Sequence, residues 1–434
     1  MASIFKKNFI IYLFFILPFT YLMGILITEI FVFLITFYFL IINKDLNFFK
    51  DKKFIFLSLL SIYIGLNAFI QIDDNLKISS LVYFRFIIFS LAIFFLLKYF
   101  EYIRNDIKNS VINICFIILS LILFDAFFQF LTGKNLLGYE ILYNRISGIF
   151  RDELVLGSFL VKILPFLTWL LFYLNVDIKE NKKKLIIFFS FYIICIFLSG
   201  ERTSLGLCIL FFIGIMLFLK QLREIFLISF SGLIIFIIFI SFFQIGKSDP
   251  NNRIFTKTFN QFTNHYFIKQ KKNKKIEEGE DIKEKIIKEN ILIFSKDHTG
   301  HFQLAFKLFR ENPIFGVGPK GFRHYCRSVN YNPEVGICST HPHNFLIQIS
   351  SETGLIGLTF YVYIFYFLIF KLFKSIKINT SLENKSLLII ISIGMLITIF
   401  PLLPSGNFFN NWISIINYYL LGIYFYSYNK VFNK

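Results

Sequence analysis

The sequence predicts an all-α, polytopic membrane protein: a bundle of about 12 transmembrane helices with one long loop that contains short helices. Of its 434 residues, 56% are hydrophobic, and the mean hydropathy is +0.66. A soluble protein cannot hide so much apolar surface in one core, whereas a membrane protein exposes it to lipid. The apolar stretches are sustained and lack period-2 alternation. This pattern favours helices over a β-barrel, because only these two structures satisfy the backbone in lipid.

Twelve apolar segments divide the chain into three parts. Residues 1–245 hold nine predicted transmembrane helices, residues 246–343 form one long hydrophilic segment, and residues 344–434 hold three more helices. Several segments are shorter than the roughly 20 residues that span a bilayer. An even number of spans places both termini on one side. The segments are 9–27, 29–42, 54–70, 81–97, 111–131, 154–174, 185–199, 203–219, 225–245, 344–370, 387–403 and 410–427.

The charges of the loops predict which side holds the termini. With both termini in the cytoplasm, the short inner loops and chain ends carry 21 Lys and Arg, whereas the short outer loops carry five. This asymmetry follows the positive-inside rule. The formal net charge of +18 is then largely a consequence of topology, and we expect no nucleic-acid partner.

The segment 246–343 lies outside in this orientation and is the expected chemical face. It carries 17 basic and 10 acidic residues, which is compatible with export because long loops translocate largely regardless of charge. The spacing of apolar residues predicts an amphipathic helix over 252–268 and a second helix over 300–310, and residues 269–288 form a solvated charged run. All six histidines are found here: His265, His298, His301, His324, His341 and His343.

Two of the five cysteines, Cys326 and Cys338, also lie in this segment. An oxidising compartment favours a disulfide between them, and closing so short a loop stabilises the fold by roughly 3 kcal/mol on the chain-entropy estimate. The alternative is a metal site that adds His341 and His343, although no CxxC spacing is present. The other cysteines lie in apolar segments, where a buried thiol is expected: Cys115, Cys195 and Cys208.

Three charged residues fall inside predicted membrane segments: Arg85, Asp125 and Lys162. A charge at such depth costs about 2.5–3.5 kcal/mol on insertion scales, so it usually has a partner or lines a cavity. One interpretation pairs Asp125 with Arg85 or Lys162. The other is an anion-binding cavity that is open to the outer leaflet.

Arg202 lies in a short outer turn, residues 199–204, between two apolar segments. A guanidinium at this place departs from the loop-charge asymmetry and offers a rigid fork that matches phosphate oxygens. Its neighbour Glu201 offers a structural ion pair as the alternative. We expect Arg202 to bind an anion.

A polar cluster, His-Pro-His-Asn at residues 341–344, marks the point where the long segment returns to the membrane. Within it, His343 is a candidate general base, because an imidazole with a reference pKa near 6.5 is available in its neutral form at about neutral pH. The plain alternative is a loop histidine ahead of a helix that Asn344 caps. Gln348 and Glu352 follow Asn344 at helical spacing, so they line a cavity or face neighbouring helices.

Several pieces, taken together and in order, resemble the signature of the O-antigen ligase and O-antigen polymerase superfamily. They are residues 145–150 (Arg-Ile-Ser-Gly-Ile-Phe), 199–202 (Ser-Gly-Glu-Arg), 312–319 (Asn-Pro-Ile-Phe-Gly-Val-Gly-Pro) and 343–344 (His-Asn) followed by 354–357 (Gly-Leu-Ile-Gly). The resemblance covers nearly the whole chain and has its core at about 140–370.

The resemblance implies a metal-independent glycosyltransferase without a cofactor, in the bacterial inner membrane and with its active face in the periplasm. Members of the superfamily transfer a glycan from undecaprenyl pyrophosphate to lipid A-core, to another carrier-linked glycan or to a protein. His343 would draw a proton from the acceptor hydroxyl, and Arg202 would neutralise the charge that develops on the departing pyrophosphate.

One departure from the superfamily concerns the second cation. Many relatives have an arginine at the start of the helix before the Asn-Pro turn, whereas residues 300–301 are Gly-His in this chain. We expect His301, Arg145, Arg151 or Lys320 to supply the positive contact. The full set of expected pyrophosphate or glycan contacts is Arg85, Arg145, Lys162, His301, Lys320 and Asn344.

The alternative function is a transporter or flippase of lipid-linked glycans, in which Arg85, Asp125 and Lys162 would gate passage. The two halves of the chain show no obvious inverted repeat, and the histidines and Arg202 gather on the outer face rather than at the midplane. Both observations favour the enzyme. Ligase and polymerase are not separated, because they share a donor and differ in the acceptor.

Overall fold

The computed structural model describes residues 2–42, 52–71, 80–100, 105–260, 296–328 and 338–432. These residues form helices joined by turns, with two isolated β-bridges and no named strand among them. The predicted all-α class is therefore confirmed. Because the apolar runs have no alternating pattern, a helix is the structure that satisfies their backbone groups locally.

Each of the twelve predicted apolar segments contains helix, with boundaries that shift by a few residues. The first segment, 9–27, is not one continuous helix. A 3-10 turn that contains Pro18 separates α1 from α2. Up to the long segment, the helices are α1 (Ala2–Ile16), η1 (Leu17–Met23), α2 (Ile25–Ile42), α3 (Lys52–Gln71), η3 (Val82–Phe84), α5 (Arg85–Tyr99), α6 (Asn105–Thr132), η5 (Gly148–Phe150), α7 (Leu156–Tyr173), α8 (Lys182–Leu198), α9 (Arg202–Phe218) and α10 (Lys220–Phe243).

The remaining helices follow the end of α10. They are η6 (Asn252–Thr256), α12 (Lys296–Glu311), α13 (Phe322–Arg327), α14 (Phe345–Lys377), α15 (Leu382–Thr398) and α16 (Asn411–Phe432). Among the described residues, seven helices are long and apolar enough to cross a membrane, and two shorter apolar helices accompany them. The chain is thus a polytopic helical membrane protein, and the number of twelve spans stays a prediction.

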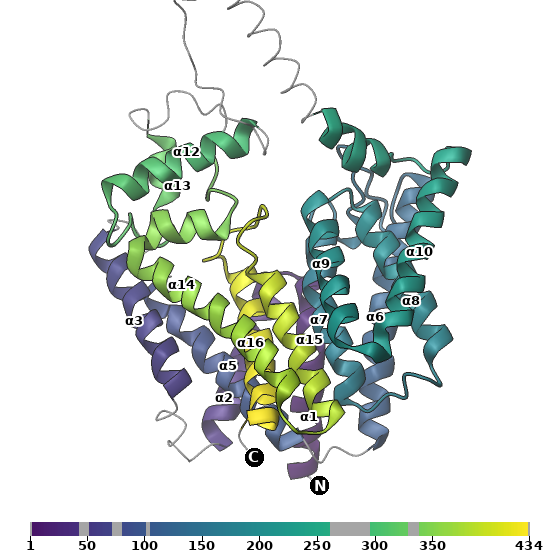
Figure 1. Cartoon of the computed structure of the whole chain (residues 1–434), viewed down its shortest axis with the longest axis horizontal. Helices are drawn as coiled ribbons and strands as arrows, with labels where there is room; N and C mark the ends of the chain where they lie inside the picture. Colours follow the sequence, from purple (N-terminus) through teal and green to yellow (C-terminus); the bar gives the residue numbers. More distant parts are fainter. Residues whose placement is uncertain are drawn as a thin grey trace, which may run out of the picture.

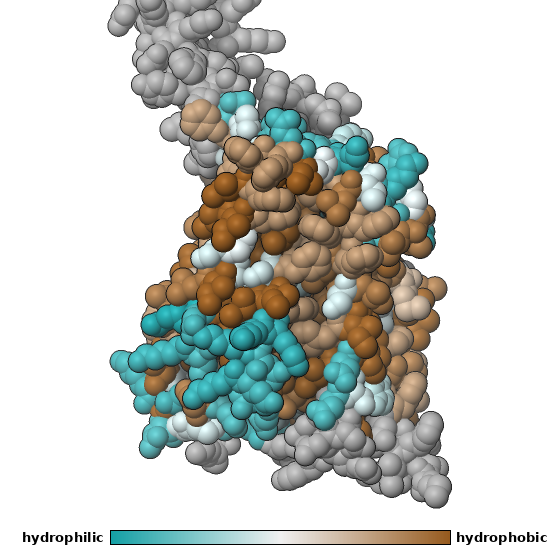
Figure 2. Space-filling model, turned by 90° about the vertical axis from the view of Figure 1, so that its right-hand side faces the viewer, coloured by the Kyte–Doolittle hydropathy of each residue, from teal (hydrophilic) through white to brown (hydrophobic). Residues whose placement is uncertain are grey.

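Helix α16 lies at the centre of the bundle and packs against α5 and α15, and α15 packs in turn against α7 and α14 (Figure 1). The interior is rich in aromatic residues, among which Trp169, Tyr192 and Tyr419 are fully buried. Large apolar side chains are also exposed, as on α10, where Ile235 and Phe242 face outward. Figure 2 shows this apolar surface as a broad band between hydrophilic ends, the arrangement expected of a protein surrounded by lipid.

The chain begins and ends on one side of the bundle. Helix α1 starts, and α16 finishes, at the end opposite α12 and α13 (Figure 1). We call the end that carries α12 and α13 the α12 end. The predicted helix over 300–310 is present as the longer α12, which ends at Glu311 ahead of Asn312-Pro313, as the residue before a proline favours.

The predicted amphipathic helix over 252–268 is described only as far as residue 260. There the backbone forms the π-helical turn η6 and continues into one α-helical turn. Residues 261–268 of this predicted helix, and the charged run 269–288, lie outside the described residues.

Helix α14 is broken at Gly354, whose φ of 61° and ψ of −163° are not helical. The break exposes backbone N–H groups to the loop 312–321, so that Leu355 N–H donates to Pro313 O at 2.8 Å. One turn earlier, Val317 N–H donates to Ser351 O at 3.0 Å. The two glycine-containing pieces of the sequence signature therefore pack on each other, backbone against backbone.

Candidate functional site

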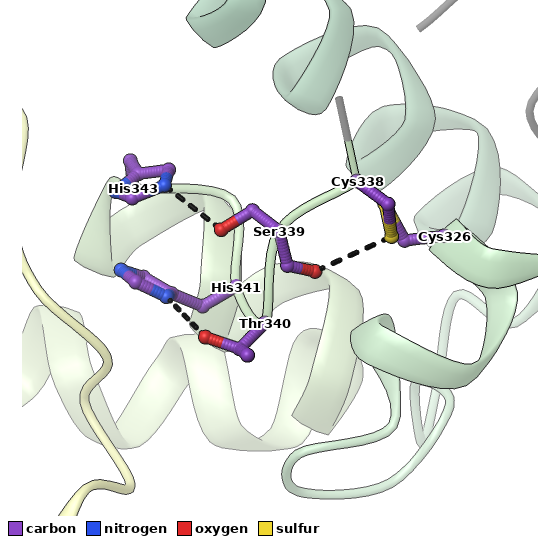
Figure 3. The surroundings of a disulfide bond; sticks show 6 residues. All are labelled: Cys326, Cys338, Ser339, Thr340, His341 and His343. Carbon is purple, nitrogen blue, oxygen red and sulfur yellow. Dashed lines mark hydrogen bonds between the residues drawn. A yellow bond between two sulfur atoms is a disulfide. The ribbon is translucent and has the colours of Figure 1, made fainter. Parts of the chain in front are cut away.

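A small second core fixes α12 and α13 above the main bundle. It comprises Leu304, Ala305, Leu308, Val317, Phe322 and Cys326, with Ile347 of α14 packed against it. Cys326 at the end of α13 forms a disulfide with Cys338, with their Cα atoms 5.5 Å apart (Figure 3). The loop that leads to α14 is thereby attached to α13 five residues before His343.

Four histidines meet in this region, with His343 in the middle. Its ring centroid lies 4.1 Å from that of His341, 5.1 Å from that of His298 and 5.5 Å from that of His301. Two come from α12 and two from the loop before α14. His324 is exposed on α13 outside this group, and His265 lies outside the described residues.

The backbone and ring of His343 are both held. Its φ of 59° is uncommon for a residue with a side chain, and such conformations cluster at functional sites. Its carbonyl accepts from Ser405 N–H at 2.8 Å, and its Nε2 shares a 2.9 Å hydrogen bond with Ser339 Oγ (Figure 3). The imidazole therefore has a fixed orientation.

Burial, together with the neighbouring His341, His298 and His301, lowers the pKa of His343 to about 3. Burial also lowers the pKa of His341 to about 4, against a hydrogen bond with the Ser405 backbone that raises it. Both imidazoles are neutral at pH 7. A neutral imidazole has a lone pair with which to accept a proton.

Asn344 fixes the end of this loop through its side chain, and its expected role as a substrate contact stays a prediction. Its Oδ1 accepts from Ile347 N–H at 3.0 Å and so caps α14. Its Nδ2 donates to Pro401 O at 2.8 Å and to Leu403 O at 3.3 Å. Because both ends of the amide are engaged, Asn344 joins α14 to the loop between α15 and α16.

Glu201 organises the turn before α9. Its carboxylate accepts from Gly157 N–H and Ser158 N–H, each at 3.0 Å, at the first turn of α7. It also forms an ion pair with Arg145 at 3.2 Å. The Arg145 guanidinium donates in addition to Leu154 O at 2.6 Å. Arg145 is therefore held by protein partners, and its expected contact with pyrophosphate stays a prediction.

Arg202 is accompanied by a cation that the sequence did not suggest, Arg253 of η6. Arg253 Nε donates to Gly200 O at 3.1 Å, and Arg202 Nε donates to Arg253 O at 3.2 Å. Gly200 has a φ of 68°, and a Cβ there would lie 2.7 Å from the Arg253 side chain. Burial lowers the pKa of Arg253, and the charges of Arg145 and Arg202 lower it further. Such crowding of guanidinium groups creates a strongly positive surface.

A cavity of about 60 Å³ lies between the start of α9 and the start of α14. Thr203 and Ser204, which follow Arg202, line one wall, and Phe345, which follows Asn344, lines another. Ser405, the backbone partner of His343, also faces it. Arg202 and His343 therefore lie next to residues that line this cavity, although neither of them is part of the lining itself.

The O-antigen ligase family model matches residues 187–362 of this chain. The match covers 176 of the 434 residues. The predicted family is confirmed, and the match lies inside the expected core of 140–370. None of the curated proteins matches the chain.

The O-antigen ligase segment contains Arg202, Arg253, His301, Lys320 and His343. It runs from the start of α8 to the middle of α14 and so includes both walls of the site. Three expected contacts lie before it: Arg85, Arg145 and Lys162. This match supports a glycosyltransferase-type membrane enzyme of surface polysaccharide biosynthesis.

A buried polar network braces the O-antigen ligase segment beneath the histidines. Gln348 Nε2 donates to Glu352 Oε2 at 2.9 Å and to Asn407 Oδ1 at 2.8 Å. Glu352 Oε1 accepts from Phe322 N–H at 3.2 Å. Of the two expectations for Gln348 and Glu352, the contact with neighbouring elements is the one observed. They tie α14 to α13 and to the α15–α16 loop.

Lys320, Arg323 and Arg85 form a second cationic group. Burial lowers the pKa of Lys320, and the charges of Arg323 and Arg85 lower it further, while Glu352 raises it. Arg85 forms an ion pair with Glu29 at 2.7 Å, and its guanidinium lies 4.7 Å from the Phe86 ring centroid. The charge of Arg85 is thus largely compensated, whereas Lys320 remains a candidate contact.

The expected pairing of Asp125 with Arg85 or Lys162 is wrong. Asp125 Oδ1 accepts from Leu136 N–H at 2.8 Å, and Oδ2 lies 3.5 Å from Asn135 Nδ2. Arg85 pairs with Glu29 instead, and Lys162 lines the 60 Å³ cavity. One backbone N–H and one side-chain amide, both in the turn after α6, therefore satisfy the carboxylate, and residue charges alone do not reveal such partners.

The described residues contain no group of three or more His, Cys, Asp or Glu side chains arranged to hold a metal ion. The considered metal site of Cys326, Cys338, His341 and His343 is incompatible with the structure, because the two cysteines are joined to each other.

Proposed function

We propose that this chain transfers a glycan from undecaprenyl pyrophosphate to a hydroxyl acceptor at the periplasmic face of the bacterial inner membrane. The acceptor is lipid A-core or another carrier-linked glycan. The observation that carries the proposal is the cavity between the starts of α9 and α14, because Arg202 begins the first of these helices and His343 lies two residues before the second.

The chemical step requires a base and a holder of negative charge. His343 accepts the proton of the acceptor hydroxyl as its oxygen attacks the anomeric carbon of the donor sugar. The bond between that carbon and the pyrophosphate oxygen breaks, and its electron pair leaves with the pyrophosphate. Arg202 and Arg253 neutralise this charge, with forks suited to phosphate oxygens.

The lowered pKa of His343 fits this sequence of events. At a pKa of about 3 the free imidazole is a weak base, since burial and three neighbouring histidines oppose a positive charge. When an anionic donor binds nearby, its negative charge stabilises the protonated imidazole and so raises the pKa of His343. The base is therefore strengthened when substrate is present.

The test of this function is deletion of the gene in its host, followed by complementation with the intact chain. Loss of a ligase is expected to leave bare lipid A-core while carrier-linked polymer accumulates, and loss of a polymerase is expected to leave single repeat units on the core. A gel of the surface polysaccharide distinguishes them. An unchanged pattern, or accumulation of single carrier-linked units on the cytoplasmic side as a lost flippase would give, contradicts the proposal.

Replacing Arg253 with alanine is expected to lower glycan transfer by about 100-fold, since removing one charge-stabilising donor typically costs 10² to 10³. Arg253→Lys retains the charge without the fork and should recover only part of the activity. The measurement is polymer or ligated glycan formed by purified protein. Arg223→Ala, an exposed arginine at the start of α10, is the control and should behave as the unmodified chain. Full activity of Arg253→Ala would remove Arg253 from the site.

A further inference from the structure

His343 stands at the end of a short arm of chain that is fixed at both ends. Cys338 begins the arm, and its disulfide with Cys326 attaches it to α13, where Cys326 is buried in the second core. At the other end, the His343 carbonyl accepts from Ser405 N–H at 2.8 Å. Ser339 directly follows Cys338, and its Oγ lies 2.9 Å from His343 Nε2 (Figure 3). The hydroxyl that meets the imidazole is therefore one residue away from a covalent anchor.

The two nitrogens of the His343 ring have different surroundings. Nε2 shares its hydrogen bond with Ser339 Oγ, whereas Nδ1 has no hydrogen-bond partner in the described part of the chain. The neighbouring His341 is arranged the other way round, because its Nδ1 shares a 3.1 Å hydrogen bond with Thr340 Oγ1. Of the two histidines of this arm, His343 is thus the one whose Nδ1 is left for a substrate.

The bond to Ser339 allows two protonation patterns of a neutral His343 ring. If Nε2 carries the proton and donates to Ser339 Oγ, the lone pair of Nδ1 is available to a substrate. If Ser339 donates to Nε2 instead, Nδ1 carries the proton and the ring has no lone pair left to act as a base. Ser339 is partly exposed, so its own O–H group can bond with water while its oxygen accepts from the ring. Only the first pattern leaves a base.

We propose that Ser339 is a positioning residue for His343: its oxygen holds Nε2–H, so that Nδ1 is the atom that takes the proton of the acceptor hydroxyl. The assignment rests on the proposed function, in which His343 is the base. As the acceptor oxygen attacks the anomeric carbon, its proton moves to Nδ1, and the pyrophosphate leaves with the electron pair of the broken bond. The imidazolium that results donates from Nε2 to Ser339 more strongly than the neutral ring does, because one partner is then charged. The disulfide keeps Ser339 in place for this contact.

Ser339→Ala is expected to lower kcat by about 10-fold and to leave KM for the donor little changed, since it removes one hydrogen bond to the base and none of the cations. The measurement is transfer by the full-length protein in detergent over a range of pH. Loss of an acceptor for Nε2–H destabilises the imidazolium, so the pKa of His343 falls and the acid limb of the kcat profile moves to lower pH. Loss of a donor to Nε2 would instead raise the pKa of His343. An unchanged kcat, or an acid limb that does not move to lower pH, overturns the proposal.

Two variants of the same arm serve as controls. Ser339→Thr keeps the hydroxyl and should restore both kcat and the pH profile. Thr340→Ala removes the matching hydroxyl partner of His341 and should behave as the unmodified chain. Equal losses of kcat in Thr340→Ala and Ser339→Ala would show that the arm as a whole is sensitive, and would reject a specific role of Ser339.

The disulfide is tested with Cys326→Ser and Cys338→Ser combined, so that neither sulfur is left as a reactive thiol. Without its anchor, Ser339 should hold the ring less well, and kcat should fall about as far as in Ser339→Ala. When Ser339→Ala is added to the cysteine pair, kcat should fall no further, because both changes act through one contact. Additive losses would reject the anchoring role of the disulfide. If the cysteine variant does not fold, the Ser339→Ala series decides by itself.

Nitrogen NMR of the folded protein with labelled histidine separates the Ser339 contact from glycan transfer itself. The His343 signal is assigned as the one lost in His343→Asn. We expect Nε2 to carry the proton in the unmodified chain without substrate, and the two tautomers to mix in Ser339→Ala. A proton on Nδ1 in the unmodified chain overturns the assignment even if transfer is confirmed. A protein that makes no glycan product but shows the expected tautomers would reject the proposed function and retain the Ser339 contact.

Discussion

Replacing His343 with alanine is expected to lower glycan transfer by about 100-fold to 10,000-fold, the usual contribution of a positioned general base. The reason is that His343 is the histidine at the centre of the cluster and the one whose loop borders the cavity with the Arg202 turn. The measurement is transfer by purified protein, supported by the polysaccharide pattern of the complemented deletion strain. Donor binding should be little changed, since the cations remain.

The matched control is His324→Ala, because His324 is exposed on α13 outside the cluster. His343→Asn is the second variant, since asparagine tolerates the left-handed backbone at this position better than alanine. Both His343 variants should be inactive and folded. Normal polysaccharide made by either of them would exclude His343 as the base and direct attention to His341, which lies 4.1 Å away between ring centroids.

Replacing Gly354 with alanine is expected to destabilise the protein severely and to lower the yield of folded chain. A Cβ at this position would lie 2.2 Å from Ile314 O and 2.6 Å from Phe315 N, both of which are backbone atoms. Overpacking of this kind costs about 1–3 kcal/mol, and the positive φ adds roughly 1–2 kcal/mol for any residue with a side chain. The contact between α14 and the loop 312–321 must then open.

Gly138→Ala separates these two contributions. Gly138 has a φ of 88°, and a Cβ there would meet nothing within 4 Å. This variant should lose only the free energy that a side chain costs at a positive φ, which corresponds to a few degrees of melting temperature. Gly354→Ala should lose far more, as read by thermal unfolding in detergent. Equal losses in the two variants would show that the packing of α14 on the loop contributes little.

Helix positions and family were accessible from the sequence because both depend on short stretches of chain. Sustained hydrophobicity identifies a membrane helix wherever the helix lies in the bundle. The candidate residues of the histidine loop and of the Arg202 turn could also be identified from the sequence. They are polar residues that stand directly beside long apolar helices, and such residues are often functional. Their placement beside one cavity could not be predicted, because it depends on how α9 and α14 pack.

Arg253 and Arg145 show why the rest of the site escaped prediction. Arg253 of η6 meets Arg202 across 51 positions of sequence. Arg145 looked like a free cation, yet Glu201 and the Leu154 carbonyl occupy its guanidinium. In both cases the deciding contact is long-range, so residue type and local spacing carry no trace of it.

The break at Gly354 also divides α14 into a part that is long enough to cross the membrane and a part that is not needed for the crossing. The helix has 33 residues, about 50 Å at 1.5 Å per residue, which exceeds the 30 Å core of a bilayer. Residues 355–377 alone exceed the roughly 20 that a crossing requires. Residues 345–353 are then not needed for the crossing, and their polar side chains Gln348 and Glu352 are buried inside the protein. Under the proposed function, this first part of α14 lies toward the layer in which a polyprenyl lipid carries its pyrophosphate.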